Sequence, residues 1–497
     1  MSARAAVVGA GFGGLALAVR LQSAGVAVTL IEARDKPGGR AYAWEEQGFT
    51  FDAGPTVITD PAAIEALFAL SGRRMADYVE LLPVSPFYRL LWPDGARFDY
   101  VGDQACLDRQ IAARNPADVA GYRRFLAFSK AVYQEGYVRL GAVPFLKVGD
   151  MLAAAPALLR LRAWRSVYAR VASDIGDERL REAFSFHTLL VGGSPFAASS
   201  IYALIHALER AGGVWFPRGG THALVRALAR LFTDLGGRLV ASDRVRRIVT
   251  EGGRVTGVEH ADGAFEAFDA LASNADIVHT YGELLGHHRR GRAVARRLRR
   301  RRFSPSLFVV HFGLKRPHAG LAHHTICFGP RYRGLIDDIY RGGALPEDFS
   351  LYLHAPCATD PALAPPGCST YYALSPVPHL GTAPIDWDVE GPRYRDRILA
   401  ALEARVLPDL RRDLVVSRIF TPADFERELG AWRGSAFSLE PILSQSAWFR
   451  THNRDDAIAN LYFVGAGTHP GAGVPGVIAS AKATAGLMIA DLAGTPA

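Results

Sequence analysis

The chain has 497 residues, of which 49% are hydrophobic and 21% charged, so it is too long for one ordinary core and is not a disordered protein. No apolar run reaches the ~18–20 residues that span a bilayer, and residues 1–14 lack the blocks of a secretory signal, so we expect neither feature. The net charge of +8 favours nucleic acid, an anionic membrane surface or an acidic substrate as a partner, unless it reflects only an arginine-rich composition.

The first predicted elements are a strand, a glycine turn, a helix and a second strand over residues 5–32. Gly9, Gly11 and Gly14 form a G-x-G-x-x-G pattern between the first strand and the helix. These glycines permit a tight turn, close approach of a pyrophosphate, and close packing of helix on strand. Glu32 ends the second strand, where an acid accepts hydrogen bonds from ribose hydroxyls. The segment therefore predicts a dinucleotide-binding βαβ unit.

Two further glycine-containing segments follow. Gly39 and Arg40 belong to a Gly-Gly-Arg turn, and Gly54, Pro55 and Thr56 end the segment FDAGPT. An arginine in such a turn pairs with phosphate, although a solvated arginine on a surface turn is the alternative. Together with the preceding unit, the pattern resembles the flavoprotein amine oxidase superfamily, which binds FAD rather than NAD. The resemblance implies that these five residues contact FAD.

A second strand, glycine loop and helix is predicted near the end of the chain. The strand is expected at residues 460–464, the loop at 465–476 and the helix at 477–492. The N-terminus of such a helix favours negative charge, as on a reduced flavin, whereas a plain turn is the alternative. The expected cofactor contacts are Gly465, Gly473, Val474, Pro475 and Val477.

Both ends of the chain thus belong to one cofactor domain, which predicts a discontinuous organisation. A hairpin is expected over 239–258 with its turn at Gly252-Gly253, and a strand at 270–277 is expected to return to the cofactor sheet. We assign 1–100, 215–280 and 430–497 to the FAD domain, 101–214 to a helical, membrane-contacting part, and 281–429 to a substrate domain.

Longer segments resemble one family over nearly the whole chain. GAGFGGLALAVRLQ, DKPGGRAY, GFTFDAGPTVITDP, AFSFHTLLVGG, GVWFPRGGT and VGAGTHPGAGVPGVI are similar to bacterial-type phytoene desaturases. The resemblance implies an α/β fold: a Rossmann-like, glutathione-reductase-like FAD domain with an inserted α+β substrate domain. It also implies non-covalent FAD, with Val245 as a further contact, and desaturation of phytoene to neurosporene or lycopene. The expected final electron acceptor is oxygen or a quinone.

An isoprenoid substrate requires a long apolar channel and a route for a proton. Asp150, an isolated acid, is the candidate proton acceptor by resemblance to the family, although it also suits a helix cap, and the basic residue that family members often carry nearby is replaced by Ala153. His187 is a second candidate, with a buried structural histidine as its alternative. The third alternative is that no side chain is essential and that flavin and bound water together handle the proton. Arg218 either steadies the flavin or lies on a surface loop.

No metal site is expected. The four cysteines form no CxxC pair, and His323 and His324 are neighbours whose side chains are expected to point apart. Nucleic acid is also not expected, because the arginine-rich segment 289–302 has no interleaved aromatic residues.

The remaining partner for the positive charge is a membrane surface. A helix over 157–171 would place Ala157, Leu161, Trp164, Tyr168 and Val171 in one apolar stripe with arginines beside it. Packing on the protein's own core is the alternative. We expect a peripheral enzyme on the cytoplasmic side of the cell membrane.

Other functions remain open within the same fold. They are a carotenoid isomerase, a desaturase of another isoprenoid, an amine oxidase, and a lipid-escort protein that binds no flavin.

Overall fold

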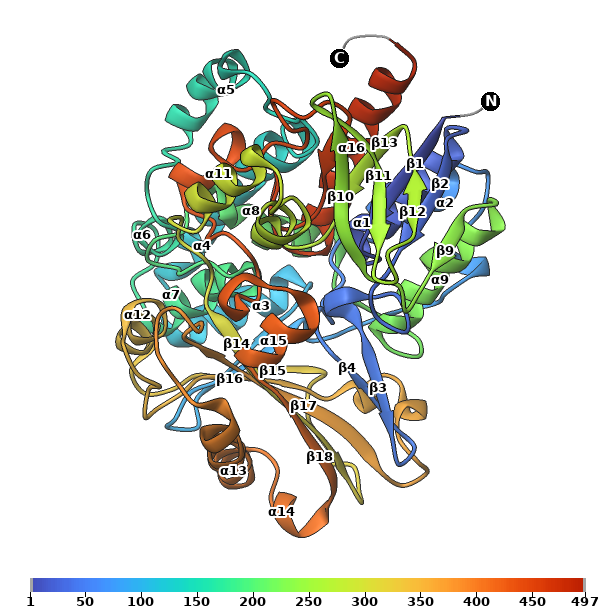
Figure 1. Ribbon diagram of the computed structural model, residues 1–497. Coiled ribbons are helices and arrows are strands. Elements are labelled where there is room, and N and C mark those ends of the chain that lie inside the picture. Colours follow the sequence, from blue (N-terminus) through green and yellow to red (C-terminus); the bar gives the residue numbers. More distant parts are fainter. Residues whose placement is uncertain (1–2, 495–497) are drawn as a thin grey trace.

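The computed structural model describes residues 3–494 and contains two main sheets with a helical region beside them (Figure 1). The first sheet is parallel, with the strand order β19-β13-β1-β2-β9. Its strands are β1 (Arg4–Val8), β2 (Ala27–Ile31), β9 (Arg238–Val240), β13 (Ala270–Ser273) and β19 (Leu461–Phe463). The central strand β1 is therefore flanked by segments far apart in the chain, as the predicted return strand requires.

Helix α1 (Phe12–Ser23) packs between this sheet, α9 (Thr221–Asp234) and α16 (Val474–Leu492). Its close approach to the sheet depends on Gly14, because a Cβ there would lie 2.0 Å from the carbonyl oxygen of Gly9. The expected hairpin is also present: β10 (Val245–Glu251) pairs with β11 (Arg254–His260) across Gly252 and Gly253, and β12 (Phe265–Ala267) extends it. The predicted Rossmann-like α/β class is confirmed.

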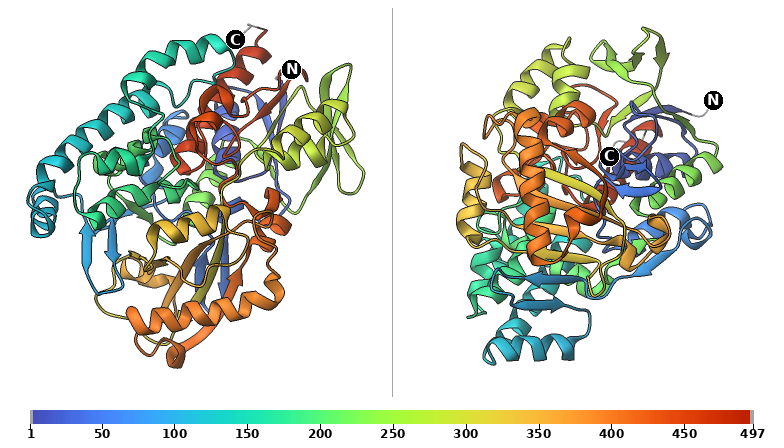
Figure 2. Two further views of the ribbon diagram at one scale, coloured as in Figure 1. Left: turned by 90° about the vertical axis from the view of Figure 1, so that its left-hand side faces the viewer. Right: turned by 90° about the horizontal axis from the view of Figure 1, so that it is seen from below.

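The second sheet has seven strands in the order β18-β14-β17-β16-β15-β6-β7. Helix α13 (Trp387–Arg405) packs on it and shares a hydrophobic core with it (Figure 2). The strands are β6 (Tyr88–Leu91), β7 (Arg97–Tyr100), β14 (Ser306–Leu314), β15 (His324–Cys327), β16 (Leu351–His354), β17 (Ser369–Val377) and β18 (Leu414–Phe420).

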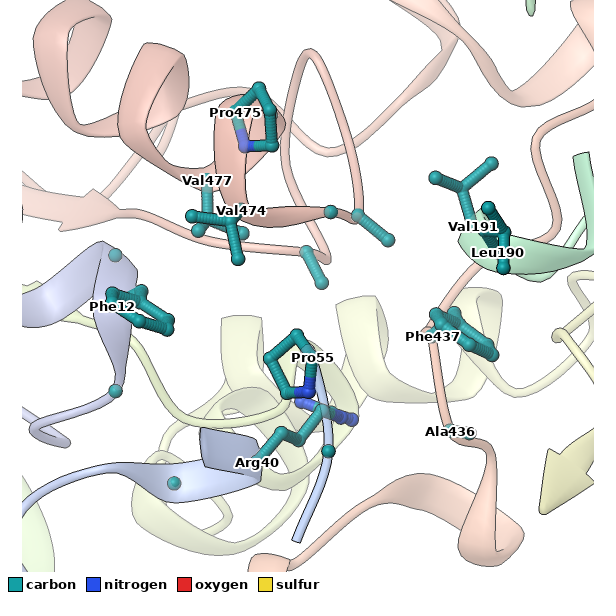
Figure 3. Close-up of a pocket in the computed structure, with 18 of the residues that line it drawn as sticks. Phe12, Arg40, Pro55, Leu190, Val191, Ala436, Phe437, Val474, Pro475 and Val477 are labelled. Atoms are coloured by element: carbon teal, nitrogen blue, oxygen red, sulfur yellow. The ribbon is translucent and has the colours of Figure 1, made fainter. Parts of the chain in front are cut away.

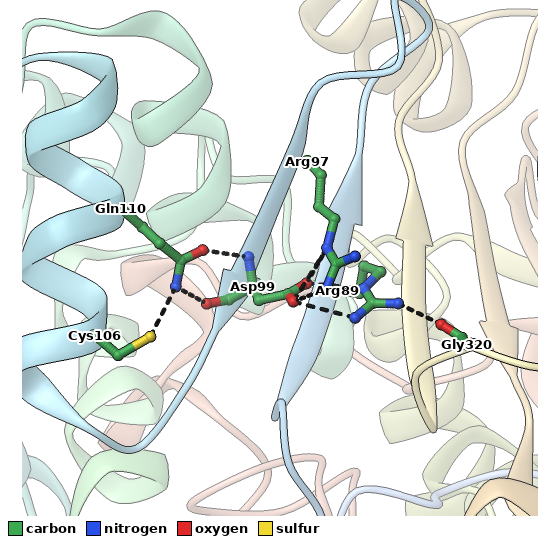
Figure 4. A network of polar contacts seen from close by, with 6 residues as sticks. All are labelled: Arg89, Arg97, Asp99, Cys106, Gln110 and Gly320. Carbon is green, nitrogen blue, oxygen red and sulfur yellow. Dashed lines mark hydrogen bonds and ion pairs between the residues drawn. The ribbon is translucent and has the colours of Figure 1, made fainter.

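The sequence analysis assigned residues 1–100 to the FAD domain, but the hairpin β6–β7 within this range belongs to the second sheet, where β6 pairs with β15. Asp99 fixes it there (Figure 4). Its carboxylate pairs with Arg89 at 2.9 Å, and its backbone exchanges two hydrogen bonds of 2.8 Å with the amide of Gln110. Arg89 also donates to the carbonyl of Gly320 at 2.6 Å. The hairpin thus joins the sheet to the helical region.

The helical region beside the two sheets contains six α-helices in its described residues. None of the described helices has the length and apolar character that crossing a bilayer requires. The helices are α3 (Gln104–Arg114), α4 (Asp118–Val132), α5 (Val148–Arg160), α6 (Val167–Ala172), α7 (Glu178–Ser185) and α8 (Leu204–Gly212).

The predicted continuous helix over 157–171 is wrong. Helix α5 ends at Arg160, Arg162 has a positive φ of 50°, and the Ser166 hydroxyl accepts the N–H of Ala169 to begin α6. The expected apolar stripe is consequently split: Ala157, Leu161 and Val171 are buried, whereas Trp164 is exposed.

The arginine-rich segment forms α11 (Arg289–Leu298). Val294 and Leu298 of this helix are buried in a core, and most of its arginines are exposed, so α11 presents a solvated basic face.

Candidate active site

A pocket of about 570 Å³ lies where the parallel sheet, the helical region and the second sheet meet. Figure 3 shows Phe12, Val474, Pro475 and Val477 on one side of it and Pro55 with Arg40 on the other. The pocket is lined by thirteen of the fifteen predicted cofactor residues. They are Gly9, Gly11, Glu32, Gly39, Arg40, Gly54, Pro55, Thr56, Val245, Gly473, Val474, Pro475 and Val477. Gly14 and Gly465 shape the backbone behind it.

The two glycine loops meet at a residue that the motifs did not single out. Asn274 follows β13, and its amide nitrogen donates to the carbonyl of Val464 at 3.0 Å. A Cβ on Gly13 would lie 2.8 Å from that nitrogen, and one on Gly465 would lie 2.4 Å from it. A side chain at either position would displace the amide of Asn274, which joins the start of α1 to the C-terminal glycine loop. The sequence could have indicated Asn274 by its position at the carboxyl end of a predicted parallel strand, because ligands bind at that edge of such sheets.

Glu32 lies at the edge of the pocket with both carboxylate oxygens held by backbone. One oxygen accepts the N–H of Ala10 at 2.7 Å, and the other accepts the N–H of Arg34 at 2.9 Å. The side chain is buried and fixed beside the N-terminus of α1. Its remaining lone pairs suit ribose hydroxyls.

Charged groups with incomplete partners face the same pocket. The Nε of Arg40 and the Oδ2 of Asp276 are buried without a hydrogen-bond partner among the described residues. Burial lowers the pKa of Arg40 and raises the pKa of Asp276, and the charge of each offsets part of the shift of the other. Unmet polar groups of this kind indicate a missing polar ligand.

Helix α16 begins at the C-terminal glycine loop. Gly473 has a φ of 96° and precedes its first turn, where Pro475 lies. The first N–H groups of the helix and its dipole favour a negative charge at this side of the pocket.

Beyond the glycine loops the pocket is apolar. It is lined by Leu189, Leu190 and Val191 from the segment FHTLLVGG, by Leu307 and Phe437, and by Met151, Ala154 and Leu158 on the inner face of α5. A long apolar hydrocarbon fits such a wall.

One buried carboxylate interrupts the apolar wall. Glu209 of α8 lines the pocket, and Tyr88 donates its hydroxyl to Glu209 at 2.7 Å. The Nε2 atom of His187 lies 3.1 Å from the Oε2 atom of Glu209, although neither atom has a hydrogen-bond partner among the described residues. Glu209 was missed because an acid on an amphipathic helix resembles any solvated acid in the sequence.

Asp150 and Arg218 are not brought to the pocket. Asp150 lies in the first turn of α5, where its carboxylate accepts the backbone N–H of Lys147 at 2.9 Å. Arg218 is exposed and pairs with the exposed Glu80 at 2.6 Å. The position of Asp150 is that of a helix cap, and its role as proton acceptor stays a prediction.

The expectation that His323 and His324 point apart is wrong. Their ring centroids lie 4.4 Å apart because His323 stands just before β15, outside the alternation of the strand.

A family model described as "Flavin containing amine oxidoreductase" matches residues 12–489. The chain belongs to this family. Its relatives include the lycopene-forming phytoene desaturase of Pseudescherichia vulneris, 66% identical over 98% of this chain and 99% of that protein. The neurosporene-forming phytoene desaturase of Cereibacter sphaeroides is 44% identical over 97% of this chain and 94% of that protein. The predicted family is confirmed.

The fold is that of other flavin-containing amine oxidoreductases. Cyclohexylamine oxidase from Brevibacterium oxydans is 16% identical and superposes with a TM-score of 0.62, covering 99% of this chain and 100% of that one. The predicted cofactor, FAD, and the class of FAD-dependent oxidoreductase are confirmed. The two glycine loops form a cradle over residues 9–14 and 465–476. This glycine cradle, Glu32 and the free Nε of Arg40 fit a dinucleotide that carries phosphates and ribose hydroxyls.

Proposed function

We propose that this protein is an FAD-dependent desaturase of phytoene and that its end product is lycopene. The observation that supports a hydrocarbon substrate is the apolar wall of the pocket. This wall continues from the glycine cradle and has few polar groups. The lycopene-forming relative is 66% identical, compared with 44% for the neurosporene-forming one, which favours lycopene.

When bound, FAD supplies the hydride acceptor for removal of two hydrogens from adjacent carbons. The chain's own residues orient the two partners and exclude water. The glycine loops with Asn274 hold the cofactor at one end, and Leu189, Leu190 and Val191 hold the hydrocarbon beside it.

The proton released with each hydride needs an acceptor in this apolar space. Glu209 lines the apolar wall, and the hydrogen bond from Tyr88 holds its carboxylate in place. We propose Glu209, rather than Asp150, as the group that accepts the proton.

The substrate dissolves in membranes, so we propose that the protein docks on the cytoplasmic surface of the cell membrane through α5. The inner face of α5 lines the pocket, and its outer side exposes Val148, Leu152 and Leu159. Lys147 and Arg160 are exposed at the ends of this helix, which suits anionic lipids. Oxygen or a quinone is the proposed electron acceptor.

The test is incubation of the FAD-loaded protein with phytoene in liposomes, followed by visible spectroscopy and separation of the products. We expect the spectrum of a long conjugated polyene, with lycopene as the main product. A carotenoid isomerase would create no new conjugation from phytoene and would contradict the proposal. Accumulation of neurosporene would support desaturase activity but would contradict lycopene as the end product.

A further inference from the structure

Three buried histidines converge behind the wall of the pocket. His324 of β15 lies opposite His354 of β16 in antiparallel register, so their side chains share one face of the sheet. The ring of His323 lies 4.4 Å from that of His324 and 4.8 Å from that of His354, between centroids. One nitrogen atom of each ring lies within 4.8 Å of those of the other two.

Contacts on the outer side orient two of the rings. The Nδ1 atom of His323 lies 2.6 Å from the hydroxyl of Thr359, and that of His324 lies 2.7 Å from the hydroxyl of Tyr352. The Nε2 atom of each ring is thereby left for the centre of the cluster. Metal-binding histidines have this arrangement, in which the second nitrogen is hydrogen-bonded and fixes the tautomer.

The inner nitrogens lack enough partners of their own. The Nε2 atoms of His323 and His354 are 3.0 Å apart and can share only one proton. The Nε2 atom of His324 is buried and has no hydrogen-bond partner among the described residues.

We propose that His323, His324 and His354 bind one Zn²⁺ ion. Zinc–nitrogen bonds of about 2.0–2.1 Å place the nitrogens of a tetrahedral site about 3.3–3.4 Å apart, close to the separation of the His323–His354 pair. Three imidazoles with a water molecule in the fourth position form a complete tetrahedral Zn²⁺ site.

Such a site would tie β15 and β16 to the pocket wall. The hydroxyl of Tyr352, which contacts His324, also lies 2.9 Å from the hydroxyl of Thr56. Both Tyr352 and Thr56 line the pocket. The ion therefore stabilises the wall without contacting the glycine cradle.

The first test is the metal content of untagged protein purified without chelators, measured by mass spectrometry of the elements. We expect about one zinc ion per chain in the natural sequence and at least about tenfold less in His324→Ala and His354→Gln. His206→Gln is the matched control. His206 is equally buried, but its two ring nitrogens contact the hydroxyls of Tyr100 and Tyr122 at 2.9 and 3.0 Å. This control is expected to keep the ion.

A second measurement uses only the unchanged chain, in case the variants do not fold. Protein stripped with a chelator is titrated with Zn²⁺ while its thermal midpoint and its flavin absorbance are followed. We expect the midpoint to rise to saturation at one ion per chain with the flavin absorbance unchanged. X-ray absorption of the loaded protein should then show imidazole nitrogens at about 2.0–2.1 Å.

The proposal is overturned if the purified protein holds no zinc and the stripped protein binds none. It is also overturned if His324→Ala retains as much zinc as His206→Gln. Because metal content is measured apart from desaturation, these outcomes do not depend on the function proposed above.

Discussion

At the scale of single residues, side chains with similar sequence surroundings have different environments in the folded protein. Arg40 and Arg218 each adjoin a glycine pair, yet Arg40 opens into the pocket with an unpartnered Nε, whereas Arg218 pairs with Glu80 on the surface. Asp150 and Glu209 differ in the same way. Asp150 stands alone in an apolar stretch of sequence but caps a helix, and Glu209 lies on an amphipathic helix, where an acid is usually solvated, but is buried at the pocket.

The two acids give a direct prediction. We expect Glu209→Gln to lower the rate of phytoene desaturation by about 10²–10⁴-fold, because a positioned base contributes that much. Asp150→Asn is the matched control and should keep the rate within about twofold, since a lost cap costs about 1 kcal/mol of stability rather than chemistry. Single-turnover flavin reduction and bound FAD per chain would be measured for both. Loss of rate in Asp150→Asn, with Glu209→Gln unaffected, would reverse the assignment.

At the scale of helices and strands, the sequence correctly predicted the elements that depend on local patterns of residues. Both glycine loops, the hairpin at Gly252-Gly253 and the returning strand β13 follow from residues close together in the chain. Contacts between distant segments could not be predicted. Asn274 matters because it meets Gly13 and Gly465, and the histidine cluster forms because β15 pairs with β16. The break after α5 depends on the positive φ of Arg162, which its residue type does not signal.

The prediction for a single element concerns the exposed side of α5, which we propose docks on the membrane. Leu152 is 67% exposed and Leu159 is 62% exposed. The double variant Leu152→Asp, Leu159→Asp replaces two apolar anchors with negative charges. We expect it to reduce sedimentation with anionic liposomes by about tenfold or more. Val389→Asp is the control, since Val389 is 52% exposed on α13, at the opposite end of the molecule (Figure 1). Equal binding of both variants would show that α5 is not the docking element.

At the scale of the whole molecule, the fold buries many histidines in their neutral form. Burial lowers the pKa of His222, His379 and His469 to about 4 and that of His311 to about 3. The unfolded chain takes up these protons near pH 6.5, so between pH 6.5 and about 4 the unfolded state binds more protons. Stability is therefore present above pH 6.5 and is lost as the pH falls through this window.

Asp52 acts in the opposite direction. Burial raises its pKa to about 6, so the folded state binds its proton first and its contribution grows as the pH falls from about 6 to 4. Burial also raises the pKa of Asp276, Glu182 and Glu440, but the histidines whose pKa is lowered outnumber these carboxyls, so the loss of stability at low pH prevails.

We therefore expect the thermal midpoint to be flat from pH 8 to about 7 and to fall steadily below pH 6.5. The free energy of unfolding should decrease by up to ~1.4 kcal/mol per pH unit for each histidine. Circular dichroism at closely spaced pH values would measure it. His379→Gln, which removes one such group away from the pocket, should show a shallower decline. A midpoint that does not change between pH 7.5 and 5 would contradict the prediction.

The order of strands in the parallel sheet also dictates when the cofactor can be taken up. Strand β19 and helix α16 complete the sheet and the cradle, and both follow every other strand in the chain. During synthesis they emerge after the rest of the sheet, so β1, β2 and β13 wait with one edge unpaired. We therefore expect the complete flavin site to form only after this last strand, and a chain that ends before residue 461 to lack the C-terminal glycine loop and the start of α16.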